Sequence, residues 1–295
     1  MNIKRKPSWL KKKLPTDIQY EKTRNLLKTC GLNTVCIEAK CPNQWECFSA
    51  HTATFLIMGS ECARNCAFCA VEHNKEPALP DKSEADRIVR AVQDMGLDYV
   101  VITSVTRDDL SDGGAFCFAE VIRKIKKFVD NAKIEILIPD FGGNKEALKK
   151  VINEKPDVLN HNVETVKRLY SSVRPEALYD RSLQIFENAR KEDPNILIKS
   201  GIMLGLGESD KEIKQTLTDI FNAGCDIITI GQYLQPSKAH LKVKEFVLPE
   251  KFEYWAKEAY LIGFSACVSG PFVRSSYYAK KVYEEAKNKR EGLTL

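Results

Sequence analysis

The sequence lacks any apolar run that approaches the roughly 20 residues a helix needs to cross a bilayer. Its first fifteen residues, MNIKRKPSWLKKKLP, are positively charged, but no apolar stretch follows them, which argues against a secretory signal. The same segment is too rich in lysine and too short for an organelle transit peptide. We therefore expect a cytoplasmic protein that has no membrane partner.

The sequence also lacks a strong excess of either charge. Its 45 basic and 40 acidic residues give a net charge of +5, which is too small to predict nucleic-acid binding. We interpret the basic residues near the N-terminus as a solvated tail, with an alternative role in steering an acidic protein partner. These residues are Lys4, Arg5, Lys6, Lys11, Lys12 and Lys13.

Cysteine, by contrast, is abundant, with ten residues in a chain of 295. Cytosolic proteins rarely use cysteines for disulfides, so clustered cysteines predict metal binding or catalysis. The first triplet is Cys36, Cys41 and Cys47, and the second triplet is Cys62, Cys66 and Cys69. The scattered residues Cys30, Cys117, Cys225 and Cys267 are expected to be small apolar residues of the core.

From Thr52 onward, short β-branched runs alternate with amphipathic segments, as is typical of parallel strands covered by helices. Six such units fall short of the eight of a closed barrel, so we predict an α/β fold, a partial (β/α)6 TIM-like barrel with a lateral opening. The expected strands are Thr54–Met58, Tyr99–Ser104, Ile134–Ile138, Val158–Asn162, Ile196–Ile202 and Ile227–Ile230. The expected helices are Glu84–Asp94, Phe116–Asp130, Lys145–Asn153, Arg181–Lys191, Glu212–Asn222 and Glu250–Leu261.

Three parts of the chain are expected on this basis. Residues 1–51 form an N-terminal extension, residues 52–262 the partial barrel, and residues 263–295 a C-terminal extension. The region before Thr52 shows no strand pattern, and we expect the two extensions to close the barrel mouth. Catalytic residues should lie at the carboxyl ends of the strands, as they do in complete barrels.

The second triplet, in Cys62-Ala-Arg-Asn-Cys66-Ala-Phe-Cys69, directly follows the first expected strand. Its offsets of 0, 4 and 7 also fit one face of a helix, but Arg64 and Asn65 make an apolar stripe a poor interpretation. A zinc site with His73 as fourth ligand is one alternative. An iron cluster held by three thiolates would instead keep one coordination position open for chemistry.

The C-x₃-C-x₂-C spacing, with Phe68 before the last cysteine, resembles the signature of radical S-adenosylmethionine enzymes. The resemblance implies a 4Fe–4S cluster whose open iron binds the methionyl amino and carboxylate groups. One electron from the cluster then produces a 5′-deoxyadenosyl radical that takes hydrogen from unactivated carbon. The protein supplies positioning and the exclusion of water.

The first triplet has offsets of 5 and 11, and Pro42 disfavours helical geometry at Cys41, so its thiols must converge through a looped backbone. C-x₄-C-x₅-C ahead of the second motif resembles the lipoyl synthase family. Further matches, from about Thr29 to Ala279, include VVITSVTRDDLSDGGA (100–115), LNHNVETV (159–166), VRPEALYDRSL (173–183), KSGIMLGLGE (199–208) and GPFVRSSYYA (270–279).

In that family the first triplet holds an auxiliary 4Fe–4S cluster whose fourth ligand is a serine of an RSSY motif. Here the motif is residues 274–277, and the resemblance implies Ser276 as the ligand, with Ser275 as the competing choice. Judged by the motif alone, both serines would instead cap a helix that begins near Tyr277.

The family's reaction, as the resemblance implies it, inserts two sulfur atoms at C6 and C8 of an octanoyl chain, with the auxiliary cluster as sulfur donor. The chain is bound to a lysine of a lipoyl carrier domain, in a 2-oxoacid dehydrogenase E2 component or the glycine cleavage H protein. Further partners are an electron donor such as ferredoxin or flavodoxin and an iron–sulfur carrier that rebuilds the cluster. The alternatives are a radical methylthiotransferase and a non-enzymatic zinc or iron–sulfur module.

Contacts to S-adenosylmethionine are expected from Phe68 and from polar residues at strand ends. Each polar residue has an ordinary loop-capping role as its alternative. A glycine turn at residues 205–208 is a weak signal for adenine binding, and His161 is not assigned as a base. The expected polar contacts are Ser104, Asn162, Glu164, Arg174 and Lys199, with Asp108 as a further candidate and with Arg174 and Lys199 facing the methionyl carboxylate.

Overall fold

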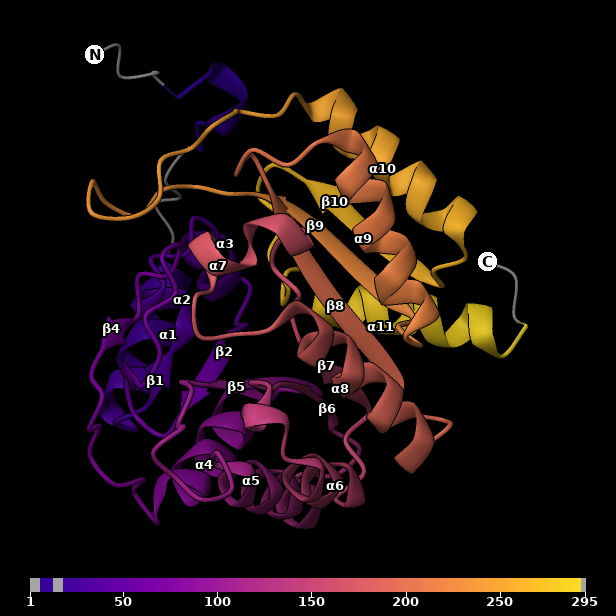
Figure 1. Ribbon diagram of the computed structural model, residues 1–295. Helices are drawn as coiled ribbons and strands as arrows, with labels where there is room; N and C mark the ends of the chain where they lie inside the picture. Colours follow the sequence, from indigo (N-terminus) through magenta and orange to yellow (C-terminus); the bar gives the residue numbers. More distant parts are fainter. Residues whose placement is uncertain (1–5, 13–17, 293–295) are drawn as a thin grey trace.

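A computed structural model describes residues 6–12 and 18–292 of the chain (Figure 1). Its main feature is an eight-stranded sheet in the order β1-β2-β5-β6-β7-β8-β9-β10, in which only β1 is antiparallel to its neighbour. This sheet confirms the predicted partial barrel. The strands are β1 (Asn33–Thr34), β2 (Thr54–Ile57), β5 (Tyr99–Ser104), β6 (Lys133–Leu137), β7 (Val158–Asn160), β8 (Leu197–Leu204), β9 (Ile227–Gln232) and β10 (Ala266–Gly270).

Helices connect the parallel strands and cover the outer face of the sheet (Figure 1). Every residue of β2 and β9 is buried, which explains why β2 and the first four residues of β9 are continuously apolar or β-branched rather than alternating. The predicted helices agree with the observed ones to within two residues at each end. The connecting helices are α4 (Glu84–Met95), α5 (Ala115–Phe128), α6 (Lys145–Asn153), α8 (Tyr179–Glu192), α9 (Asp210–Asn222) and α10 (Pro249–Ile262).

Four of the observed strands were not predicted, and two of them, β1 and β10, belong to the main sheet. β10 is a seventh parallel strand, which follows the six predicted β/α units and pairs with β9. The sequence of β10, Ala-Cys-Val-Ser-Gly, is short and rich in small residues, and only Ala266 is fully buried, so its strand pattern is weak. β1 has two residues, too few for any periodicity, and corrects the expectation that no strand precedes Thr52.

The N-terminal extension lies beside the β1–β2 edge of the sheet (Figure 1). It contains α1 (Ile18–Thr29), α2 (Val35–Glu38) and α3 (Gln44–Ser49). Tyr20 of α1 stacks on Trp45 of α3 with ring centroids 3.9 Å apart, and Thr23 donates a hydrogen bond to the carbonyl of Phe48. Helix α1 therefore fixes α3, the helix that carries Cys47.

Helix α11 (Ala279–Arg290) covers the opposite end of the barrel from the carboxyl ends of the strands. It buries Val282, Tyr283 and Ala286 in a small apolar cluster separate from the main core. Their partners are the first residues of four neighbouring strands: Val158, Leu197, Ile227 and Ala266. Among the described residues, no helix combines the length and the apolar character that crossing a bilayer requires.

Candidate active site

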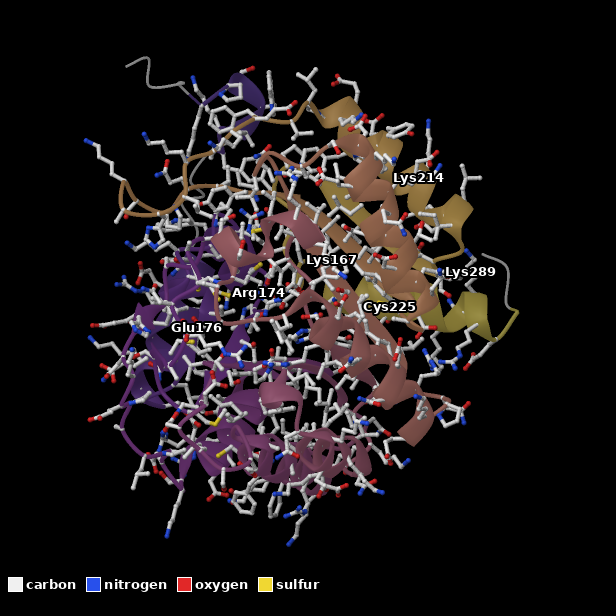
Figure 2. All side chains as sticks on the ribbon, in the orientation of Figure 1. Lys167, Arg174, Glu176, Lys214, Cys225 and Lys289 are labelled. Carbon is white, nitrogen blue, oxygen red and sulfur yellow. The ribbon has the colours of Figure 1, made fainter. Side chains whose placement is uncertain are left out.

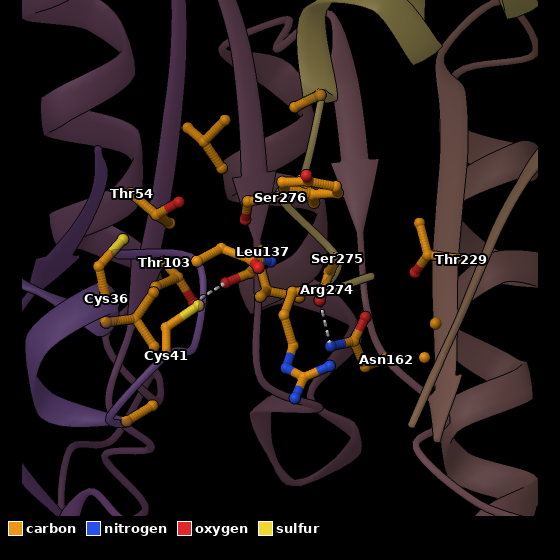
Figure 3. Close-up of a pocket in the computed structure, with 18 of the residues that line it drawn as sticks. Cys36, Cys41, Thr54, Thr103, Leu137, Asn162, Thr229, Arg274, Ser275 and Ser276 are labelled. Atoms are coloured by element: carbon orange, nitrogen blue, oxygen red, sulfur yellow. Dashed lines mark hydrogen bonds between the residues drawn. The ribbon is translucent and has the colours of Figure 1, made fainter. Parts of the chain in front are cut away.

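A single cavity of about 820 Å³ is lined by all six grouped cysteines (Figure 3). Its size is in the range of pockets that bind cofactors and small molecules. Figure 3 shows Cys36 and Cys41 on one side of this cavity and Thr229 on the other, with Arg274 between them. All ten cysteines lie in the described part of the chain, and none of them forms a disulfide. The structure therefore brings both predicted triplets to one space.

The second triplet lies in a loop between two short paired strands, β3 (Glu61–Cys62) and β4 (Glu72–His73). Backbone hydrogen bonds fix this loop from three directions. The Thr106 nitrogen, after β5, lies 3.3 Å from the Cys62 sulfur. The Ala67 nitrogen lies 3.0 Å from the Val173 carbonyl oxygen, and the Leu241 nitrogen lies 3.1 Å from the Ala67 carbonyl oxygen. The loop is thus preorganised by segments that follow other strands.

Arg64, inside that loop, is a buried anchor that the sequence did not identify. Its Nε and Nη2 atoms lie 2.5 and 2.9 Å from the carboxylate of Asp108, and Nη2 lies 2.6 Å from Oδ1 of Asp140. Burial opposes ionisation of Asp140, but the hydrogen bond and charge of Arg64 outweigh it and lower the Asp140 pKa to about 2. Asp108 thus binds Arg64 and does not line the cavity, which corrects its suggested cofactor contact.

Burial favours the protonated form of several thiols of the two triplets. Burial raises the pKa of Cys36 and of Cys69 to about 12, and neighbouring thiols of the same triplet add to each shift. Burial also raises the pKa of Cys66, although the charge of Arg174 partly offsets it. Because thiolates are the ligands of iron, binding of a metal cluster would release protons.

Within the described residues, no three histidine, cysteine, aspartate or glutamate side chains lie close enough together to hold a single metal ion. Nδ1 of His73 lies 3.2 Å from the carbonyl oxygen of Cys62 rather than beside the three sulfurs. A zinc site with His73 is therefore not formed. The six cysteines stay predicted cluster ligands, supported by the cavity that they share.

Buried polar atoms without protein partners mark part of the cavity wall as a ligand site. Oγ of Ser104, Oδ1 of Asn162 and Nε of Arg174 are buried and unpaired within the described structure. Each such atom costs about 1–3 kcal/mol unless a ligand or water satisfies it. A Cβ atom at Gly201 would lie 2.9 Å from Asn162 Oδ1 and 2.6 Å from Thr229 Oγ1, so glycine keeps this space open. These residues fit a polar ligand such as an amino-acid group.

Glu164 and Arg174 complete this wall. Glu164 has a φ of 69°, a left-handed conformation that is strained for a non-glycine residue and that often accompanies function. Burial raises its pKa, and Nδ2 of Asn162 lies 3.0 Å from its carboxylate. Nη1 of Arg174 lies 2.8 Å from the Asn162 carbonyl oxygen and 3.3 Å from the hydroxyl of Tyr170. The Arg174 side chain is buried, and Figure 2 shows it near the centre of the view.

Phe68 also lines the cavity, where it packs against Val173, Leu206 and Tyr233. Lys199, in contrast, does not line the cavity. It is 1% exposed, and its ammonium lies 2.9 and 3.1 Å from the two carboxylate oxygens of Glu135. Lys199 therefore forms an ion pair inside the barrel, which corrects its predicted contact with the methionyl carboxylate.

Two further sequence signals have structural explanations. A Cβ atom at Gly205 would lie 2.4 Å from the carbonyl oxygen of Glu245, so packing between loops requires this glycine, and it does not line the cavity. His161 is buried, with Nδ1 2.9 Å from the Ile138 carbonyl oxygen and Nε2 3.0 Å from Oγ of Ser182. Burial lowers its pKa to about 4, so its imidazole is neutral at physiological pH.

The four scattered cysteines lie in or against apolar packing, as predicted. Cys225 is buried, and Cys30, Cys117 and Cys267 are half-buried against the main core. Burial raises the pKa of Cys267 to about 12, which is typical of an inert thiol.

The RSSY segment, which lies between β10 and helix α11, lines the cavity (Figure 3). Asn162 donates a hydrogen bond to Oγ of Ser275 over 2.8 Å, whereas the Ser276 hydroxyl has no hydrogen-bond partner in the described structure. Neither serine caps a helix. Helix α11 begins at Ala279, its N-cap residue is Tyr278, and no side chain accepts a capping hydrogen bond there. The sequence did not identify Arg274 as a site residue, although it lies in the cavity near Cys41 and Glu164.

The parallel barrel and the three-cysteine loop at its mouth place the chain in the radical SAM superfamily, whose family model matches residues 56–220. The chain belongs within it to the lipoyl synthase family. The N-terminal domain of lipoyl synthase matches residues 1–41. Lipoyl synthase of Desulfotalea psychrophila is 54% identical over 97% of this chain and 95% of that protein. Lipoyl synthase of Alkaliphilus metalliredigens is 52% identical over 97% and 98%.

Solved structures agree with the superfamily at the level of the fold. A maturase of the FeFe hydrogenase has a TM-score of 0.57 at 17% identity and covers 72% of this chain and 49% of its own. Coproporphyrinogen III oxidase of Escherichia coli, a radical SAM enzyme, has a TM-score of 0.53 at 14% identity, with coverage of 80% and 57%. The methylthiotransferase and zinc-module alternatives gain no support from these relatives.

Proposed function

We propose that this protein inserts two sulfur atoms, at C6 and C8, into an octanoyl chain on a lysine of a lipoyl carrier domain. The observation that supports this reaction is the single cavity lined by both cysteine triplets. A reaction that moves sulfur from one cluster to a carbon activated at another needs both groups to face one acyl chain. The residues that line the cavity fit these groups in number, in chemistry and in the unpaired polar atoms they present.

When bound, the cluster at the second triplet and S-adenosylmethionine supply a radical able to take hydrogen from an unactivated carbon, and the auxiliary cluster supplies the sulfur. A C–H bond has no polarity for an acid or base to act on, so positioning dominates the protein's contribution. Arg174, Asn162 and Ser104 offer unpaired donors and acceptors to the methionyl group, and Glu164 lies beside them. Phe68 packs against the same wall.

The acyl chain is expected to lie along the apolar part of the cavity. Leu56, Val101 and Leu137, from three adjacent strands, line the cavity near the first triplet. These side chains would bind methylene groups and exclude water from the reacting carbon. The lysyl end of the substrate would then face the mouth of the cavity, and the carrier domain would remain outside it.

We assign Ser276 as the fourth ligand of the auxiliary cluster. Ser275 already accepts a hydrogen bond from Asn162, whereas the Ser276 hydroxyl has no partner in the described structure and faces the cavity. An alkoxide is a harder and poorer partner for iron than a thiolate, which suits a cluster that must come apart.

The wider setting is part of the same proposal. The carrier is a 2-oxoacid dehydrogenase E2 domain or the glycine cleavage H protein. Ferredoxin or flavodoxin supplies electrons in the cytoplasm, and an iron–sulfur carrier rebuilds the cluster. The division into residues 1–51, 52–262 and 263–295 also stays a prediction.

Anaerobic reconstitution followed by reaction with an octanoyl-lysyl peptide tests this function. Mass spectrometry should show two sulfurs added to the peptide, with one 5′-deoxyadenosine formed for each. A variant with alanine at Cys36, Cys41 and Cys47 should still cleave S-adenosylmethionine but insert no sulfur. The variant with alanine at Cys62, Cys66 and Cys69 should do neither. Sulfur insertion by the first variant, or a peptide modified by a methylthio group, would contradict the proposal.

A further inference from the structure

Three segments that are far apart in the sequence meet beside the first triplet. They are the segment at Lys12 in the N-terminal extension, the start of helix α3 with Asn43 and Glu46, and the C-terminal segment around the RSSY motif. We call their contacts the Glu46 clamp. Its members are Lys12, Asn43, Glu46, Phe272, Tyr277 and Tyr278.

Glu46 is the centre of the clamp because both of its carboxylate oxygens are engaged. Oε1 accepts hydrogen bonds from the hydroxyls of Tyr277 and Tyr278, at 2.5 and 3.1 Å. Oε2 accepts a hydrogen bond from the ammonium of Lys12 at 2.7 Å. Hydrogen bonds to a charged acceptor are about twice as strong as neutral ones, so this carboxylate is the main link between the segments.

The remaining contacts reinforce that link. Nδ2 of Asn43 lies 2.6 Å from the carbonyl oxygen of Phe272, and the Lys12 ammonium lies 2.6 Å from Oδ1 of Asn43. The same ammonium lies 4.8 Å from the ring centroid of Phe272 and 5.5 Å from that of Tyr277. The segment between Cys41 and Cys47 is therefore bound directly to the residues on both sides of the RSSY serines.

Ser276 is held only through its neighbours. Ser275, before it, is bound by Asn162 on the adenosylmethionine side of the cavity. Tyr277 and Tyr278, after it, are bound by Glu46 on the side of the first triplet. The Ser276 hydroxyl itself has no hydrogen-bond partner in the described structure. Its position therefore depends on these two flanking anchors.

We propose that Glu46 is a positioning residue that, through Tyr277 and Tyr278, holds Ser276 at the first triplet and thereby controls how firmly that triplet retains iron. This inference rests on the proposed function, in which Ser276 is a cluster ligand. It adds that retention of the auxiliary cluster depends on contacts between the two extensions, and not on the four ligands alone. Partners of ligands commonly affect metal affinity by about 10–100-fold.

The test measures iron release to a ferrous chelator from the reconstituted, full-length chain without oxygen. In a background with alanine at Cys62, Cys66 and Cys69, only the first triplet holds iron. There Glu46→Ala should release iron about tenfold faster than the parent. Glu46→Gln should lie between the parent and Glu46→Ala, because its amide oxygen can still accept from both tyrosines but its uncharged NH2 group cannot bind the Lys12 ammonium. Tyr277→Phe, a milder change, should be intermediate.

Two comparisons distinguish positioning from general stability. In a background with alanine at Cys36, Cys41 and Cys47, Glu46→Ala should not change iron release from the second triplet. Glu285→Ala is the matched control. Glu285 also accepts a hydrogen bond from a tyrosine, the Tyr260 hydroxyl, over 2.6 Å, but it does not line the cavity. This substitution should leave both release rates unchanged.

The proposed role of Glu46 is overturned if Glu46→Ala releases iron at the parent rate, or if it accelerates release from both triplets alike. The outcome for Ser276→Ala separates the two proposals. If Ser276→Ala also leaves release and the cluster's spectrum unchanged, the ligand assignment itself fails. If Ser276→Ala accelerates release and Glu46→Ala does not, only the clamp fails.

Discussion

At the scale of single residues, Arg64 is a buried cation that binds two carboxylates. Its side chain is 5% exposed, and it compensates the fully buried carboxylate of Asp140 while also binding Asp108. Removing one partner of a buried ion pair typically costs about 3–5 kcal/mol, because the other charge stays buried. Arg181 also lies 3.3 Å from the Asp140 carboxylate, so Arg64→Met should destabilise the metal-free protein by about 3 kcal/mol, the lower end of that range, in urea denaturation.

The matched control for this prediction is Arg87→Met. Arg87 pairs with Asp81, but both side chains are substantially exposed, so its loss should change the free energy of unfolding by less than about 1 kcal/mol. Equal effects of the two substitutions would contradict the role given to Arg64.

Asp140 gives the stability a defined dependence on pH. Its pKa is lowered from 3.8 to about 2 in the folded protein, so the folded state favours the ionised form. The contribution of about 2 kcal/mol is therefore fully present above pH 4 and is lost as the pH falls toward 2. Urea denaturation across this range should show a steeper loss for the wild type than for Asp140→Asn. Parallel curves would show that Asp140 is not the group responsible.

At the scale of elements, strand β8 keeps the cavity open through Gly201. This position does not have a positive φ, so alanine is allowed by the backbone, but its methyl group would crowd Asn162 and Thr229. Overpacking of this kind costs about 1–3 kcal/mol. Gly201→Ala should therefore weaken S-adenosylmethionine binding about tenfold in calorimetry of the reconstituted protein.

Gly270→Ala on strand β10 is the control for that measurement. A Cβ atom there makes only an ordinary contact, 3.5 Å from a Val273 methyl group, and Gly270 does not line the cavity. Its affinity should match the wild type. Equal weakening by both substitutions would mean that general strain in the sheet, and not the space beside Asn162, is responsible.

The elements that the sequence predicted are those with a strong periodic pattern. Lys145–Asn153 and Tyr99–Ser104 were predicted to the residue, because each has a clear apolar pattern between turn residues. β10 has too many small residues to show such a pattern, and helix α1 has only three buried positions in twelve residues. Both are stabilised by contacts with distant segments, which a local pattern does not contain.

Site residues divide in the same way. The cysteines are visible in the sequence because their spacing is specific. Lys199 was misplaced because its buried partner, Glu135, lies 64 residues away. Glu46 and Tyr277 are separated by 231 residues, so no local signal could pair them. The sequence therefore indicated the two cysteine triplets, which the structure brings to one cavity, but not the contacts that hold them.

At the scale of the whole molecule, the barrel has two differently closed ends. The cavity extends from the carboxyl ends of the strands through the barrel to the first turns of helix α11, and α11 covers the amino ends with its own small apolar cluster. Val282→Asp would bury a charge in that cluster and should destabilise the protein by at least about 3 kcal/mol in urea denaturation. Lys281→Asp, on the exposed face of the same helix, should change stability by less than about 0.5 kcal/mol. A tolerated Val282→Asp would show that α11 does not close the barrel.

Two iron clusters facing one cavity are the central claim, and the iron and sulfide content of the reconstituted protein tests it most directly. The wild type should hold about eight irons per chain, and each triple-alanine variant, of the first or the second triplet, about four. Zinc in place of iron would contradict the account. So would a wild type that holds about four irons, if one triple-alanine variant retains all of them and the other holds none.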